Sequence, residues 1–153
     1  MKNINLFILV LSLTCFACSA TAQYAKVNEP NMTKPKLFQN LPTDIVVSPE
    51  KLSDILNYEV GQTVNINLSP ELQIQGQVVS TASKYENSIQ SIVIAATNYN
   101  GARLTLSKLT NAEKQTTYRG RIISFQHGDL FELTNRNNQY SFIKKNFYDL
   151  VSE

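Results

Sequence analysis

Apolar and polar residues alternate with a period of two through most of the chain beyond residue 60. The alternation is clearest over residues 63–68, where Val, Ile and Leu are separated by Thr and Asn. A period of two sends successive side chains to opposite faces of a strand, so each such stretch has one polar and one apolar face. The pattern predicts about seven strands. Their expected ranges are 63–68, 72–78, 89–97, 102–109, 117–125, 129–134 and 139–144.

The predicted strands are joined by short segments of roughly three to eight residues. Parallel strands need crossovers of a dozen or more residues, so only antiparallel neighbours fit. Gly101, after Asn98-Tyr99-Asn100, indicates a tight hairpin because glycine accepts a positive φ. We therefore expect an all-β fold, a single antiparallel meander that forms a small barrel or a sandwich.

One short helix is predicted before the strands, over residues 49–57. Ser48 suits the N-cap position and Pro49 the first turn, and apolar residues recur at helical spacing after them. Residues 23–47 are expected to be a flexible leader to about Lys36, followed by apolar pieces that dock onto the domain. Residues 48–153 then form one β domain.

Residues 1–22 have the three parts of a secretory signal peptide. Lys2 supplies a positive start, residues 6–13 an apolar run, and Ala20-Thr21-Ala22 a small-residue cleavage site. The apolar run is too short to span a bilayer, so no transmembrane span is expected. The sequence thus predicts a bacterial protein exported to the periplasm or the medium and cleaved after Ala22.

Cys18 offers a second interpretation of the same segment. It follows Ala17, as in the lipidation box of bacterial lipoproteins, although that box has an aliphatic residue where this chain has Cys15. A lipid on Cys18 would anchor the protein to a membrane that it does not span, as an outer-membrane lipoprotein. The residues alone leave both interpretations open.

Charge and cysteine content exclude several functions. The chain has 14 Lys and Arg against 12 Asp and Glu, which argues against a nucleic-acid binder because such proteins need a concentrated positive field. Cleavage after Ala22 would remove both cysteines, and with them any disulfide, thiolate metal site or thiol nucleophile. We expect no cofactor and no metal.

His127, the sole histidine, stands two residues before Asp129. A hydrolytic triad needs a third group, and the chain has no Gly-x-Ser-x-Gly elbow. Catalytic zinc takes several nitrogen or sulfur ligands, which one histidine does not supply. We interpret His127-Gly128 as the centre of a two-residue hairpin that pairs Phe125 with Leu130. A hydrolase using His127 and Asp129 ranks last among the hypotheses.

Other residues suggest binding. Arg119 and Arg121 alternate along one predicted strand, and with Arg103 on the preceding strand they would form a basic stripe that binds an anionic ligand. The alternative is that these charges only keep the exposed strand face soluble and discourage edge pairing. Phe125 and Leu130 either lie under the helix, which we expect, or form a binding patch.

Two tyrosines are further candidates. Tyr85 and Tyr99 fall in predicted loops, where tyrosine makes efficient contacts with a partner. The alternative is that both pack over the ends of the sheet.

Four runs within residues 75–142 carry a resemblance to a known family. They are Gln75-Gly76-Gln77-Val78, Ser91-Ile92-Val93-Ile94, Tyr118-Arg119-Gly120-Arg121-Ile122 and Leu130-Phe131-Glu132-Leu133. This succession resembles the β-rich propeptide region of secreted zinc metallopeptidases. The chain departs from that family by lacking a His-Glu-x-x-His segment and a peptidase domain. The resemblance implies an inhibitory, chaperoning or recognition role without catalysis.

The favoured hypothesis is an exported, non-enzymatic β domain that binds another protein in the cell envelope or the medium, such as an extracellular peptidase. Loops and an exposed strand edge would supply its contacts. The alternative is an envelope-associated lipoprotein with a structural role, lipidated on Cys18.

Overall fold

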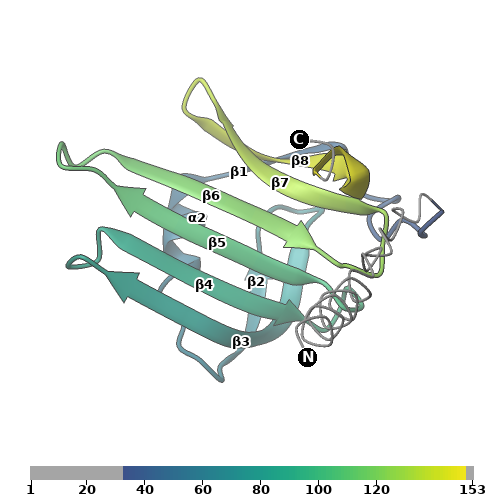
Figure 1. The fold of residues 1–153 in the computed structure, drawn as a ribbon, viewed down its shortest axis with the longest axis horizontal. Coiled ribbons are helices and arrows are strands. Elements are labelled where there is room, and N and C mark those ends of the chain that lie inside the picture. Colours follow the sequence, from purple (N-terminus) through teal and green to yellow (C-terminus); the bar gives the residue numbers. More distant parts are fainter. Residues whose placement is uncertain (1–32, 151–153) are drawn as a thin grey trace, which may run out of the picture. The chain divides into compact units, whose positions relative to one another are not determined.

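The computed structural model describes residues 33–150, and these form one curled antiparallel sheet with the outline of a half-barrel (Figure 1). Short connections and alternating side chains produce this architecture, as predicted. The elements are β1 (Asp44–Val47), α2 (Pro49–Ile55), β2 (Thr63–Asn67), β3 (Gln73–Lys84), β4 (Ile89–Ala96), β5 (Arg103–Thr110), β6 (Thr116–Ile123), β7 (Asp129–Arg136), β8 (Gln139–Asn146) and the 3-10 helix η2 (Phe147–Leu150).

The strand order is β1-β8-β7-β6-β5-β4-β3-β2, so β2 to β8 form an up-and-down meander. The sequence predicted this all-β meander, but with about seven strands instead of eight. The additional strand, β1, pairs with β8, and only Ile45 and Val47 among its four residues are buried. So short a segment shows no clear period. In the described part of the chain β1 and β2 are both edges, so the sheet is open and not a closed barrel.

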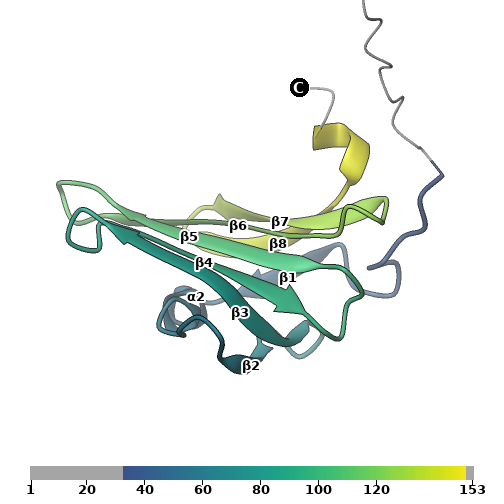
Figure 2. The same cartoon turned by 60° about the horizontal axis from the view of Figure 1, so that its bottom comes forward.

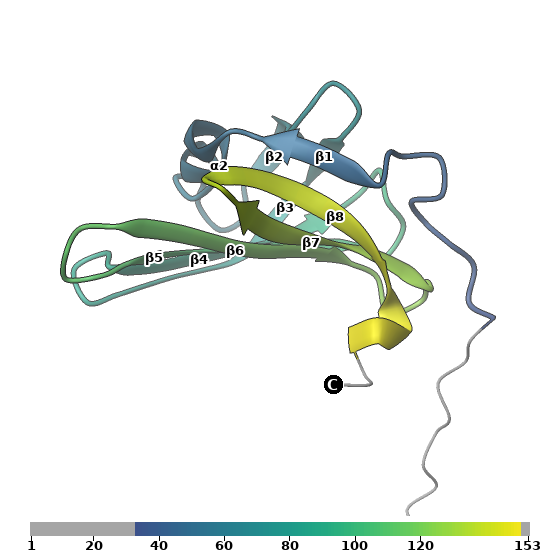
Figure 3. The same cartoon turned by 90° about the horizontal axis from the view of Figure 1, so that it is seen from above.

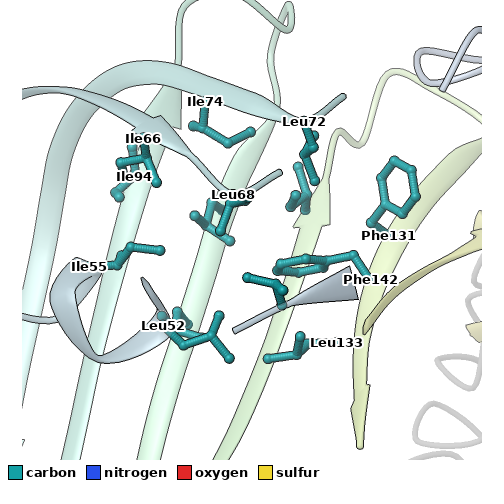
Figure 4. Close-up of a cluster of buried hydrophobic side chains, with 14 of the residues drawn as sticks. Leu52, Ile55, Ile66, Leu68, Leu72, Ile74, Ile94, Phe131, Leu133 and Phe142 are labelled. Atoms are coloured by element: carbon teal, nitrogen blue, oxygen red, sulfur yellow. The ribbon is translucent and has the colours of Figure 1, made fainter. Parts of the chain in front are cut away.

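Helix α2 lies on the concave face of the sheet, as Figures 2 and 3 show from two sides. Ser48 is its N-cap, and the Ser48 hydroxyl accepts a hydrogen bond from the Lys51 N–H at 3.4 Å. Leu52 and Ile55 are buried, as the helical spacing predicted. They meet side chains from β2, β4, β7 and β8 in the core (Figure 4).

Strand β3 continues to Lys84, where the sequence predicted a loop over residues 80–87. A bulge at Val79 shifts its register with β4, and residues 79–84 are exposed. Because none of these side chains is buried, the sequence of residues 79–84 shows no alternation of apolar and polar residues from which a strand could be predicted. The β3–β4 and β5–β6 hairpins project beyond the helix (Figure 3).

The hairpin predicted at His127-Gly128 is wrong in register. The structure pairs Ile123 with Leu130 and Arg121 with Glu132, so Phe125 does not face Leu130. Strands β6 and β7 are joined by the five residues 124–128, with the turn closed by a hydrogen bond from the His127 N–H to the Ser124 carbonyl. The connection is longer than the predicted two-residue turn because it contacts a distant segment of the chain. The Gly128 N–H donates a hydrogen bond to the carbonyl of Pro35.

Candidate functional site

The face of the sheet opposite α2, called here the outer face, carries all three arginines singled out in the sequence. Register places Thr105 opposite Arg121, Ser107 opposite Arg119, and Arg103 opposite Ile123. Residues directly opposite each other share a face of the sheet. Arg103, Arg119 and Arg121 therefore lie on the same outer face, with Arg121 between the other two along the strands, and all three are exposed.

The expectation that the helix covers the side of Ile123, Phe125 and Leu130 is wrong. Figure 2 shows α2 and β2 beneath the sheet and η2 above it. The apolar residues of α2 join the core with Ile122 and Phe131, which point to the other face from Ile123 and Leu130. Over β4, β5 and β6, the outer face is left open by the described chain.

A cleft of about 660 Å³ lies on the outer face where β6 and β7 separate. Pairing between these strands is confined to residues 121–123 and 130–132, and beyond it the β7–β8 hairpin turns away from β6 (Figure 1). We call this the outer-face cleft. Its lining residues are Thr105, Ser107, Arg119, Gly120, Arg121, Ile123, Phe125, Glu132 and Leu133.

The carboxylate of Glu132, in the cleft, is already paired with two cations. Glu132 receives the Arg121 guanidinium at 2.8 Å and the Lys145 ammonium at 2.5 Å. The hydrogen bond from Lys145 is the largest cause that lowers the pKa of Glu132, with that from Arg121 adding to it and burial opposing it. Among residues 33–150 neither Arg103 nor Arg119 has an ion pair. The cleft thus has an uncompensated cation in Arg119.

Phe125 stands at the rim of the cleft with 71% of its surface exposed. Its ring meets Phe147 of η2 edge-on, with centroids 5.9 Å apart, and its carbonyl accepts a hydrogen bond from the Lys34 ammonium at 2.8 Å. The loop is therefore fixed while much of the ring faces solvent. Leu130, by contrast, is completely buried between Ile123 and Lys145 of the neighbouring strands and offers no surface to a ligand.

Neither candidate tyrosine lines the cleft. Tyr85 lies in the β3–β4 turn with a φ of 52° and an exposure of 75%. Tyr99 packs against Phe38, with ring centroids 5.3 Å apart, and burial raises the pKa of its hydroxyl.

His127 and Asp129 form no hydrogen bond with each other in the described part of the chain. The two carboxylate oxygens of Asp129 accept hydrogen bonds from the N–H groups of Leu37 and Phe38, at 2.6 and 2.9 Å. His127 Nδ1 lies 2.8 Å from the hydroxyl of Ser124, a residue that is completely buried. Asp129 therefore anchors a distant segment, and the serine beside the histidine is not open to a substrate.

A second hollow of about 370 Å³ adjoins the cleft and shares Arg121 and Glu132 with it. Its carboxylates include Asp129 and Glu132, which are already bound as described. No group of three or more His, Cys, Asp or Glu residues suited to a metal occurs within residues 33–150. The outer-face cleft is the stronger candidate site.

The sequence indicated Arg119, Arg121 and Phe125 but missed Glu132, Lys145 and Leu133 as their neighbours. Their involvement follows from the true register of the β6–β7 hairpin, which depends on contacts with residues 35–38. The alternation of apolar and polar residues along β6 does not predict at which residue the pairing with β7 ends.

Comparisons with protein-family models, curated proteins and solved structures find no match to this chain. The resemblance to metallopeptidase propeptides stays a prediction. The predicted signal peptide of residues 1–22 and the predicted alternative of a lipid on Cys18 concern residues outside the described part of the chain. No helix within residues 33–150 is long and apolar enough to cross a membrane.

Proposed function

We propose that this chain is an exported, non-enzymatic binding domain that engages another protein through the outer-face cleft. One observation carries the proposal: an exposed aromatic ring, Phe125, and a cation, Arg119, that has no ion pair within residues 33–150 line the same cleft, on a sheet face that those residues leave uncovered. Aromatic residues and arginines are the side chains that contribute most to protein interfaces. The signal-peptide pattern of residues 1–22 supports export, which would place the protein in the periplasm or the medium.

Rigidity of the site supports this role. Phe125 is held by the Phe147 ring and the Lys34 ammonium, and Arg121 is fixed by Glu132. A surface whose side chains are already ordered loses less conformational entropy when a partner binds. The backbone of Arg119 is held by the pairing of β6 with β5, opposite Ser107.

Site-specific crosslinking tests the proposal. A photoreactive phenylalanine analogue replaces Phe125 in one variant and Tyr85 in a matched control, since both aromatics are highly exposed. After irradiation in the native envelope or medium, we expect position 125 to yield a defined adduct with one protein and position 85 to yield none. Equal adducts at both positions, or none at position 125, would contradict the proposal.

A further inference from the structure

The charges on the outer face are unequally distributed, although the chain as a whole is close to neutral. Register places Lys84, Arg103, Arg119 and Arg121 on this face of β3 to β6, and no Asp or Glu of those four strands accompanies them. Glu132, on β7, is held by Arg121 and Lys145. The face therefore has a positive excess that the described chain does not neutralise.

This excess adjoins apolar surface. Ile123 is half-buried, and Phe125 beyond it exposes most of its ring, so an apolar end of the cleft follows Arg119 along the direction of β6. Ile123 lies four positions after Arg119, which corresponds to roughly 13 Å along an extended strand. A ligand that satisfies both ends needs an anion and an apolar group at about that separation.

We infer that the outer-face cleft recognises an extended peptide segment with an acidic side chain on Arg119 and an apolar side chain on Ile123 and Phe125, about four positions apart. The inference rests on the proposed function and specifies the chemistry of its partner. A carboxylate matches the guanidinium of Arg119 through charge-assisted hydrogen bonds, which are stronger than neutral ones. The apolar side chain removes part of Phe125 from water.

Strand addition at the edge of β6 accounts for these features less well. The edge N–H of Tyr118 already donates to the Tyr140 hydroxyl at 3.2 Å, and the two rings meet edge-on with centroids 5.5 Å apart. An added strand would have to displace Tyr140 to form its main-chain hydrogen bonds. Recognition by side chains on the outer face leaves this contact intact.

A display library of random twelve-residue peptides, selected on the immobilised protein, tests the inference. The Arg119→Gln, Phe125→Ala double variant is the counter-selection surface, and Arg136→Gln with Tyr85→Ala is the matched control. All four positions are exposed, so thermal melting should show that both variants remain folded. We expect the wild type and the control to enrich one consensus, with Asp or Glu about four positions from a large apolar residue, and the double variant to lose it.

The enriched peptide is then synthesised with its acidic residue intact and as the amide. We expect the amide form to bind the wild type at least about tenfold more weakly, and the two forms to differ little on Arg119→Gln. No enrichment, a consensus without an acidic residue, or the same consensus on the double variant would overturn the inference. Binding to phosphatidylglycerol vesicles that competes with the peptide, or pairing of two copies of the chain through Phe125, would also overturn it.

These outcomes are distinct from failure of the proposed function. If crosslinking at position 125 captures one protein while the peptides show no acidic preference, the cleft is a protein-binding site with another chemistry. If crosslinking at position 125 yields nothing, the proposed function itself fails.

Discussion

Asp129, at the start of β7, accepts a hydrogen bond from the N–H of Phe38 at 2.9 Å, across 91 positions of the chain. Phe38 is completely buried, with its ring between those of Tyr99 and Phe131. This contact fixes the segment that precedes β1 and the loop that carries Phe125. The site therefore depends on residues that the local sequence around it does not contain.

Asp129→Asn should destabilise the fold, because the amide supplies one acceptor oxygen where the carboxylate now serves two backbone donors. Loss of a buried charge-assisted hydrogen bond costs about 1–3 kcal/mol. Urea unfolding at neutral pH measures the loss, with Asp44→Asn as the exposed control. Equal stability of both variants and the wild type would contradict this role for Asp129.

The meander, the single helix and the burial of Leu52 and Ile55 were predictable, since the period of the apolar residues, the short connections and the helix-start residues Ser48 and Pro49 are all local features of the sequence. The β6–β7 register was not, because the docking of residues 35–38 onto Asp129 and Gly128 lengthens that loop. A pattern in one strand cannot reveal a contact 91 positions away. For the same reason the sequence identified Arg119 and Phe125 as candidates but not the cleft between them.

Gly76→Ala should disrupt the pairing of β3 with β4. A Cβ at this position would overlap the carbonyl oxygen of Ala95, which is backbone and cannot rotate away. We expect a loss of at least about 3 kcal/mol in the free energy of unfolding, which is large for one methyl group. Chemical denaturation measures it, and Ser80→Ala on the exposed part of the same strand should change little.

Stability should depend on Glu132 in a pH-dependent way. Its pKa is lowered in the folded protein, so its contribution is present at neutral pH and is lost as the pH falls through that lowered pKa. The contribution should be under about 1 kcal/mol, because Arg121 and Lys145 are partly exposed. The stability difference between wild type and Glu132→Gln should shrink from pH 7 to pH 3. A difference that grows on acidification would contradict the assignment.

The mature N-terminus tests the proposed export. Intact mass of the protein recovered from its native compartment should correspond to a chain that begins at Gln23. A mass that includes an acylated cysteine at position 18 would support the lipoprotein alternative. Retention of residues 1–22 would contradict both forms of processing.

The most direct test of the proposed function is the affinity of the crosslinked partner for four single variants. We predict that Arg119→Gln and Phe125→Ala each weaken binding at least about tenfold, the effect expected for residues at the centre of an interface. Arg136→Gln and Tyr85→Ala, which alter an arginine and an aromatic ring outside the cleft, should bind like the wild type. Wild-type affinity in both cleft variants would contradict the assignment of the outer-face cleft as the binding site.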